Sequence, residues 1–171
     1  MFKAIVACDR NWGIGKGNQL LCHLPGDLRY FKEMTLGKRI LVGRKTLDSF
    51  PGGRPLPGRD NIVLSRDPSF AREGCTVCRS IEESLTLEGD IFVCGGESIY
   101  RALLPWTDTV YVTKIDAAFE ADRYFPDLDS DPAFALDWEA EESCEDNGIR
   151  YRFTKYIRIK EDEEDASETD E

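Results

Sequence analysis

Short apolar runs alternate with segments of helical character along most of the chain. The runs are four to eight residues long, as strands of a covered sheet are, and we predict strands at residues 2–8, 39–43, 61–65, 75–78, 90–94 and 109–116. The segments between them predict helices at residues 24–34, 44–50, 80–87 and 96–104. Strands that alternate with helices indicate a largely parallel sheet covered on both faces, with the loops at the strand ends forming one crevice.

The rest of the chain adds a loop and a hairpin to this alternation. Residues 9–18 are too rich in glycine for regular structure, and we expect a loop that is long enough to act as a flap. Residues 135–139 and 149–157 are extended segments that predict a closing antiparallel hairpin. The chain has 171 residues and no internal repeat, so we predict a single α/β domain over residues 1–160.

The helix predicted at residues 24–34 carries a carboxylate on its apolar side. At 100° per residue, Asp27 falls in the middle of the apolar arc, and no Lys or Arg within one turn shares that face. Asp27 is therefore either a cap of the first helical turn, where acidic residues are favoured, or a buried carboxylate with a functional role. The pattern alone leaves both alternatives open. The apolar arc consists of Leu24, Leu28, Tyr30, Phe31 and Met34.

The last eleven residues carry most of the net charge, which is -11 for the whole chain. Residues 161–171 hold eight Asp or Glu and no Lys or Arg, which leaves 25 acidic and 22 basic residues and a balance of -3 in the rest. Such a tail cannot bury apolar surface, so we expect it to be disordered and to serve solubility or, alternatively, an interaction. The body shows no basic stripe, so we expect no nucleic-acid partner.

The six cysteines are expected to be reduced thiols of a cytoplasmic protein. Residues 1–6 lack the long apolar core of a signal peptide, and no run reaches membrane-spanning length. Cys75 and Cys78 form one CxxC, whose odd spacing on a strand would turn the two thiols to opposite faces. His23 is the only histidine, so we expect neither a histidine-based triad nor a metal site.

Three strand ends carry residue types that bind phosphate. Gly43-Arg44-Lys45 places cations at a helix start, where free backbone N–H groups converge. Ser65-Arg66 follows a strand and can hold a phosphate by charge-assisted hydrogen bonds. Gly95-Gly96 allows a ligand to approach the backbone closely. Each feature also occurs on ordinary solvated surfaces, and GxGxxG is absent, so these residues alone do not identify the ligand.

Taken together, the motifs of this chain resemble those of the dihydrofolate reductase family, in register from Ile5 to about Phe153. The resemblance implies NADPH-dependent reduction of 7,8-dihydrofolate to tetrahydrofolate on a three-layer fold with a mainly parallel eight-stranded sheet. It also implies dihydrofolate and antifolates as small-molecule partners, and we expect a monomer. The motifs are Gly15, Leu24-Pro25-Gly26-Asp27-Leu28, Phe31, Gly43-Arg44-Lys45-Thr46, Arg54-Pro55-Leu56-Pro57-Gly58-Arg59, Asn61-Ile62-Val63-Leu64-Ser65, Gly95-Gly96, Tyr100, Thr113, and Asp122 with Phe125-Pro126.

The resemblance assigns the substrate side of the site. Asp27 would accept hydrogen bonds from the pterin 2-amino group and N3, with Thr113 as its hydroxyl-bearing neighbour, and these two are the predicted catalytic residues. Arg59 would pair bidentately with the glutamate carboxylate of the substrate. We expect burial to raise the pKa of Asp27. The predicted substrate-binding residues are Ile5, Asp27, Leu28, Phe31, Arg59, Cys94 and Thr113.

The resemblance also assigns NADPH to the glycine-rich strand ends. Ser65 and Arg66 would recognise the 2′-phosphate, and the flap at residues 11–20 would close over the nicotinamide, with Asp122 as its distal contact. The predicted cofactor-binding residues are Ala7, Ile14, Gly15, Leu20, Gly43, Arg44, Lys45, Thr46, Leu64, Ser65, Arg66, Gly95, Gly96, Glu97, Ser98, Ile99 and Tyr100.

The chain departs from the family pattern at two places. Leu21-Cys22 stands where the family usually has Pro-Trp, whose indole N–H holds a water near the pterin, and a thiol fills that role only weakly. Pro51-Gly52-Gly53 lengthens a loop near the cofactor. Two other interpretations stay open: another reductase of this fold, such as the pyrimidine reductase of riboflavin synthesis, and a folate-binding module that has lost catalysis.

Overall fold

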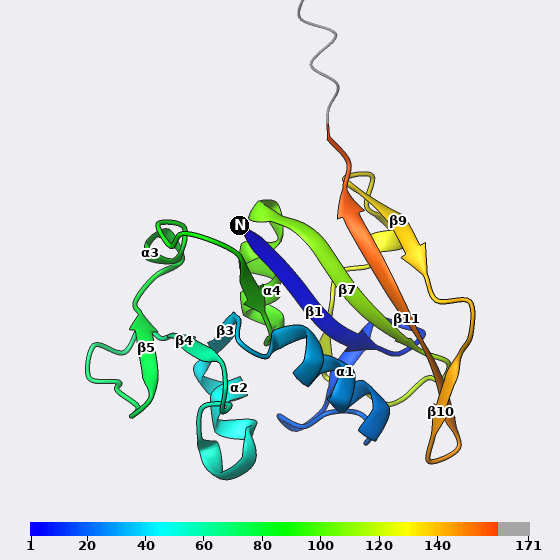
Figure 1. Cartoon of the computed structure of the whole chain (residues 1–171), viewed down its shortest axis with the longest axis horizontal. Coiled ribbons are helices and arrows are strands. Elements are labelled where there is room, and N and C mark those ends of the chain that lie inside the picture. The colour runs from blue at the N-terminus through cyan, green and yellow to red at the C-terminus, as the bar shows by residue number, and fades with distance from the viewer. Residues whose placement is uncertain (161–171) are drawn as a thin grey trace, which may run out of the picture.

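The computed structural model describes residues 1–160, and the predicted disordered tail at residues 161–171 lies outside the described residues (Figure 1). The helices are α1 (Pro25–Thr35), α2 (Arg44–Ser49), α3 (Ile81–Ser84) and α4 (Glu97–Leu103), with short 3-10 turns η1 (Pro51–Gly53), η2 (Leu104–Trp106) and η3 (Leu128–Ser130). The strands are β1 (Phe2–Cys8), β2 (Gly13–Gly15), β3 (Arg39–Gly43), β4 (Asp60–Leu64), β5 (Cys75–Cys78), β6 (Ile91–Val93), β7 (Thr107–Ile115), β8 (Arg123–Tyr124), β9 (Phe134–Glu139), β10 (Cys144–Asp146) and β11 (Ile149–Arg158).

The main sheet is mostly parallel, in the order β10-β11-β7-β1-β6-β3-β4-β5. All pairs from β7 to β5 are parallel, and β11 runs antiparallel to β7. The strands β9 and β10 pair with different parts of β11, residues 154–158 and 149–151. Since β7 pairs with one edge of β11, β9 and β10 lie one after the other along its other edge. The nine strands of the sheet therefore occupy eight positions across it. The predicted fold class and its antiparallel C-terminal strands are confirmed.

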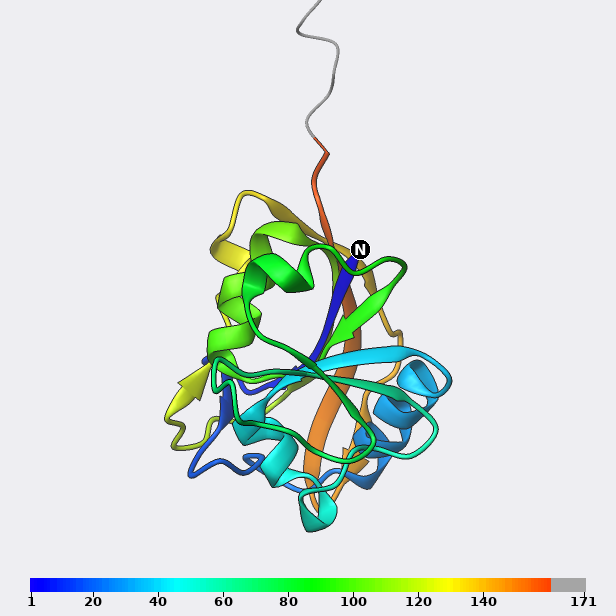
Figure 2. The same cartoon turned by 90° about the vertical axis from the view of Figure 1, so that its left-hand side faces the viewer.

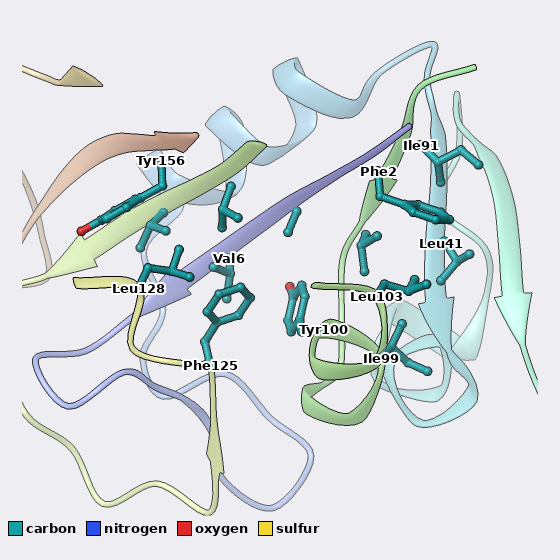
Figure 3. Close-up of a cluster of buried hydrophobic side chains, with 14 of the residues drawn as sticks. Phe2, Val6, Leu41, Ile91, Ile99, Tyr100, Leu103, Phe125, Leu128 and Tyr156 are labelled. Atoms are coloured by element: carbon teal, nitrogen blue, oxygen red, sulfur yellow. The ribbon is translucent and has the colours of Figure 1, made fainter. Parts of the chain in front are cut away.

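Alternate residues of each central strand face opposite layers of helices, as the period of a strand requires. On β1, Phe2 and Val6 belong to the core cluster that includes Tyr100 of α4, while Ile5 packs with Phe31 of α1. Figure 2 shows α4 and α1 on opposite sides of the sheet. In Figure 3 the rings of Tyr100 and Phe125 lie beside each other under β1, with their centroids 4.9 Å apart. The three-layer arrangement therefore follows from the apolar pattern.

Two local predictions differ from the structure. The flap contains a short strand, β2, which pairs with β8 across more than a hundred residues, and its glycines gave no local indication of this partner. The helix predicted at residues 80–87 ends at Ser84, although Ser80 does cap it by accepting a hydrogen bond from Glu83 N at 3.0 Å.

The topology brings the ends of several strands together. Because β1, β3, β4 and β6 are parallel neighbours, their carboxyl ends meet at one edge of the sheet, where loops form a crevice. Cys75 and Cys78 face different core clusters, as predicted, and all six cysteines are free thiols. No helix among residues 1–160 is long and apolar enough to cross a membrane.

Candidate active site

Asp27 and Thr113, the two predicted catalytic residues, are in direct contact. The Thr113 hydroxyl donates a hydrogen bond of 2.6 Å to Asp27 Oδ1. Thr113 lies on β7 with only 3% of its surface exposed, and Asp27 is partly buried in the first turn of α1. Leu24, at the start of α1, and Ile115 of β7 belong to the same buried cluster, which holds the first turn of α1 beside β7. Asp27 is therefore a partnered carboxylate on the covered side of its helix.

The pKa of Asp27 is raised above its ordinary value, as predicted. Burial is the largest cause, because it disfavours the charged form. The hydrogen bond from Thr113 acts in the opposite direction and lowers the pKa, and the nearby charge of Asp146 raises it again. Asp27 is thus a group that holds a proton more readily than a solvated aspartate does.

A hollow beside Asp27 gathers residues from the flap, β1, α1 and β7. Ala7, Ile14, Leu20 and Leu28, all predicted site residues, contribute to its wall. Cys22 also lines it, so the thiol occupies the place where the family pattern has an indole, and burial together with the charge of Asp27 raises the pKa of this thiol. The complete lining is Ala7, Ile14, Leu20, Leu21, Cys22, Leu24, Asp27, Leu28 and Ile115.

The remaining predicted substrate residues extend from this hollow along α1. Phe31 and Cys94 pack against the buried cluster around Ile5. Arg59 lies at the far end of the helix, where its guanidinium donates to the Pro57 carbonyl at 2.8 Å and to Thr35 Oγ1 at 3.4 Å. Asp27 and Thr35 are eight residues apart on α1, which corresponds to about 12 Å along the helix. The carboxylate and the guanidinium therefore mark the two ends of an elongated site.

The glycine-rich ends of β3 and β6 pack against each other. Gly43 N donates to the Gly95 carbonyl at 2.9 Å, and Gly95 has a φ of 127°, which favours glycine. A Cβ added at Gly95 would lie 3.3 Å from Thr46 Oγ1, so the two turns leave little room for side chains. The Gly95-Gly96 peptide bond is cis. The Tyr100 hydroxyl donates to the Ile5 carbonyl at 2.7 Å, which ties α4 to β1 below these turns.

Arg44, Ser65 and Arg66 lie at the ends of the adjacent strands β3 and β4. Arg44 donates to Asp67 Oδ2 at 3.3 Å, and Ser65 Oγ accepts a hydrogen bond from Asp67 N at 3.3 Å. Leu64 and Ser65 are buried, whereas Arg66 is exposed. Arg44 and Arg66 thus follow the ends of two neighbouring strands at one corner of the crevice, and both residues are exposed.

The other predicted cofactor residues contribute less through their side chains. Glu97 accepts a hydrogen bond from Tyr124 N at 3.2 Å, and Ile99 is buried in the core. Ser98 and Lys45 are exposed, and the Lys45 carbonyl accepts from Asn18 Nδ2 of the flap at 3.0 Å.

The flap is held by two aspartates, of which the sequence analysis identified one. Asp122 N donates to the Gly15 carbonyl at 3.0 Å, and Asp122 Oδ2 accepts from Gly17 N at 3.1 Å. The other is Asp9, which is only 5% exposed and accepts hydrogen bonds from Asn11 N, Gly13 N and Phe119 N at 2.8–2.9 Å. An aspartate that precedes a glycine-containing turn is a local signal for the first two bonds, but the third partner is distant in sequence.

The sequence also did not predict a contact between β10 and α1. Asp146 Oδ2 accepts hydrogen bonds from Gly26 N at 2.7 Å and from the Tyr151 hydroxyl at 2.6 Å. The two segments are 120 residues apart, so no local pattern could have paired them.

The comparisons with known proteins agree with this geometry. The family model for dihydrofolate reductase matches residues 1–158. The dihydrofolate reductase of Bacillus subtilis is 42% identical over 159 residues, covering 91% of this chain and 94% of that protein. The type 3 dihydrofolate reductase of Salmonella typhimurium is 42% identical over 142 residues, covering 81% of this chain and 83% of that protein.

A solved structure is similar over almost the whole chain. It is the dihydrofolate reductase from Enterococcus faecalis complexed with NADP(H) and RAB-propyl, with a TM-score of 0.84, 34% sequence identity, and coverage of 94% of this chain and 97% of that chain. The family model spans all the residues that build the crevice. The chain therefore belongs to the dihydrofolate reductase family.

Proposed function

We propose that the hollow beside Asp27 receives the pterin ring of 7,8-dihydrofolate. As a dihydrofolate reductase, the protein reduces 7,8-dihydrofolate to 5,6,7,8-tetrahydrofolate with NADPH. The observation that carries the assignment of the site is the Thr113–Asp27 pair at 2.6 Å. A carboxylate held in this way on an otherwise apolar wall matches a ring that offers adjacent N–H donors.

On the substrate side, the residues divide by the part of the molecule that they contact. Asp27 accepts hydrogen bonds from the 2-amino group and N3, and Leu28 and Phe31 pack on the pterin and benzoyl groups. The backbone carbonyls of Ile5 and Cys94 border the ring. Arg59 binds the glutamate carboxylate at the far end of α1, where Pro57 and Thr35 already orient its guanidinium. The separation of Asp27 and Arg59 along the helix supports an extended substrate.

The opposite wall fits the cofactor. Gly43 and Gly96 stand at the starts of α2 and α4, and since glycine has no side chain to cap a helix, the first-turn N–H groups can serve a phosphate. Arg44, Lys45 and Thr46 would hold the phosphates, and Ser65 with Arg66 the 2′-phosphate. Ala7, Ile14, Gly15, Leu20 and Tyr100 would surround the nicotinamide. The reduced nicotinamide, when bound, supplies the hydride that C6 of the pterin accepts.

The residues of the chain contribute to the reaction by positioning the bound rings and by supplying a carboxylate that retains its proton more readily than a solvated one. The apolar wall of the hollow and the flap exclude water, which strengthens the interaction of Asp27 with the ring. N5 of the pterin must gain a proton as C6 gains the hydride. Because burial raises the pKa of Asp27, this side chain favours protonation of the bound ring at neutral pH.

The test compares wild type with Asp27→Asn. We expect the wild-type protein to oxidise NADPH steadily when given dihydrofolate, and the variant to lose hydride transfer at pH 7 by about a hundredfold or more, the effect typical of a lost general acid. NADPH binding, measured by fluorescence titration, should stay within about twofold, since Asp27 lies on the substrate wall. Equal loss of hydride transfer and NADPH binding, or loss of neither, contradicts the assignment.

We further infer that the protein acts as a cytoplasmic monomer that also binds antifolates. All predicted site residues come from one chain, so the site does not require a second copy, and the six free thiols suit a reducing compartment. Light scattering at micromolar concentration should give the mass of one chain, and a 2,4-diaminopteridine should compete with dihydrofolate. A dimer mass, or inhibition that dihydrofolate does not relieve, contradicts these inferences.

A further inference from the structure

We propose that Asp146 is a positioning residue for Asp27, because its carboxylate caps helix α1 from strand β10 at the residue that precedes Asp27. The inference rests on the proposed role of Asp27 in binding the pterin. Asp146 is not among the predicted site residues, and its strand β10 is distant from α1 in the sequence.

Helix α1 cannot cap its own first turn. Leu24 occupies the N-cap position and Pro25 follows at N1, so no side chain there can accept a hydrogen bond from the first free N–H groups. Asp146 fills this role from β10, since its Oδ2 accepts from Gly26 N at 2.7 Å. The capped peptide group leads directly into Asp27, so this hydrogen bond fixes the backbone from which the carboxylate projects.

Asp146 is itself held by a buried partner. The Tyr151 hydroxyl donates to the same oxygen at 2.6 Å, and Tyr151 is only 2% exposed. The next residue, Asn147, donates from Nδ2 to the His23 carbonyl at 2.9 Å. The end of β10 and the turn after it therefore bind the chain on both sides of Leu24.

Gly26 is matched to this arrangement. A Cβ at position 26 would overlap the Tyr151 hydroxyl and approach Asp146 Oδ2 to 2.9 Å. The absence of a side chain at position 26 is thus what lets Tyr151 and Asp146 reach the helix start. These three residues form a set that links β10 and β11 to the turn carrying Asp27.

The charge of Asp146 acts in the same direction as burial. It raises the pKa of Asp27, while the hydrogen bonds from Tyr151 and Gly26, together with the charges of Arg29 and His23, lower the pKa of Asp146 itself. Asp146 is therefore ionised throughout the neutral pH range, and its negative charge acts on Asp27 over that whole range. The groups that face Asp27 from the surrounding elements are Cys8, Cys22, Tyr30, Thr113, Asp146 and Tyr151.

Two substitutions separate the cap from the charge. Asp146→Asn keeps a side-chain oxygen that can accept from Gly26 N but removes the charge, whereas Asp146→Ala removes both. In single-turnover hydride transfer from NADPH to dihydrofolate, D146N should shift the pH profile to lower pH. The rate above the apparent pKa should fall about two- to threefold, with the low-pH plateau unchanged. D146A should lower the plateau as well, because Asp27 is no longer held in place.

Glu145→Gln is the matched control. Glu145 lies on the same strand, is exposed and pairs with Arg150 at 3.8 Å. E145Q therefore removes one negative charge and no hydrogen bond to α1. Its pH profile should coincide with that of wild type. A second readout does not depend on activity: the carboxyl carbon of Asp27, assigned in NMR spectra by its loss in Asp27→Asn, should titrate at lower pH in D146N.

The outcomes separate this inference from the proposed function. If Asp27→Asn abolishes hydride transfer but D146N and D146A keep the wild-type profile and Asp27 titration, Asp146 has no positioning role and the inference is wrong. If Asp27→Asn retains wild-type activity, the proposed function fails first. Should D146A not fold, D146N and the NMR titration still decide, since D146N preserves the hydrogen-bonding oxygen.

Discussion

The hydroxyl of Thr113 on β7 donates a 2.6 Å hydrogen bond to Asp27 on α1, and so joins the sheet to the helix beside the hollow that Asp27 lines. This bond stabilises the charged form of Asp27, whereas burial stabilises the neutral form. The two effects oppose each other on one carboxylate, and each can be changed separately.

Thr113→Val removes the donor while nearly preserving shape. Because the hydrogen bond lowers the pKa of Asp27, its loss should raise that pKa further and move the pH profile of hydride transfer upward. The KM for dihydrofolate should rise about fivefold, as expected for one lost hydrogen bond of about 1 kcal/mol. Thr154→Val is the control, because it removes a buried 2.7 Å hydrogen bond to the Val112 carbonyl without touching Asp27. An unchanged KM in Thr113→Val would contradict the prediction.

Asp27 should lower the stability of the protein at neutral pH. Its pKa is higher in the folded chain than in the unfolded chain, so the folded state binds the proton more tightly. Stability is therefore lost as pH rises from the ordinary aspartate pKa through the raised pKa of Asp27. We expect Asp27→Asn to have a higher free energy of unfolding in urea than wild type at pH 7, and an equal one at low pH.

Asp146→Asn should change the free energy of unfolding in the opposite direction. Hydrogen bonds from Tyr151 and Gly26 lower the pKa of Asp146, so its contribution is present above the ordinary aspartate pKa and is lost as pH falls. This variant should be less stable than wild type at pH 7, and the difference should shrink in acid. If both variants were more stable than wild type at pH 7, or both less stable, the assignment of these two carboxylates would be wrong.

The choice between NADPH and NADH should depend on the corner formed by Arg44, Ser65 and Arg66. Arg66→Ala should lower kcat/KM for NADPH about tenfold, the loss of one charge-assisted hydrogen bond at an exposed site, and should leave kcat/KM for NADH unchanged. Arg150→Ala, at an exposed arginine of β11, is the control. Parallel losses with both cofactors would mean that the 2′-phosphate binds elsewhere.

Arg59 should act only on substrates that carry the glutamate. Arg59→Gln is expected to raise the KM for dihydrofolate about tenfold or more, because a bidentate pair with a carboxylate is lost. The KM for a dihydropterin without the benzoylglutamate should not change, and this substrate is the internal control. An equal rise with both substrates would place Arg59 on the pterin instead.

The sequence predicts best those features whose interacting residues lie close together in the chain. Residues 2–8 form the predicted strand, and the helix at residues 25–35 differs from the predicted 24–34 by one residue at each end, because the apolar period of each segment is set by its own residues. The partner of Asp27 is 86 residues away, and only the family resemblance pointed to Thr113. Asp146 and Asp9 belong to no motif that the resemblance used, and their partners Gly26 and Phe119 are more than a hundred residues distant. Such long-range hydrogen bonds become visible only in the fold.

Asp9 should control the flap over the cofactor wall. Its buried carboxylate joins the start of the flap to Phe119 N at 2.9 Å, and Asp9→Asn would place an amide N–H group against one of these backbone N–H donors. A buried donor left without an acceptor costs about 1–3 kcal/mol, so the free energy of unfolding should fall by that amount. NADPH affinity should fall about three- to tenfold, since Ile14 and Leu20 lose their fixed position.

The control for this last variant spans the same two segments. Asp116→Asn removes an exposed ion pair with Arg10 at 2.6 Å, and exposed pairs contribute about 1 kcal/mol or less. Hydrogen exchange at Gly13 and Gly15 should accelerate in Asp9→Asn and stay near wild type in Asp116→Asn. If both variants loosen the flap equally, net charge rather than the buried carboxylate holds it. If neither does, the hydrogen bonds between Asp122 and the flap are sufficient by themselves.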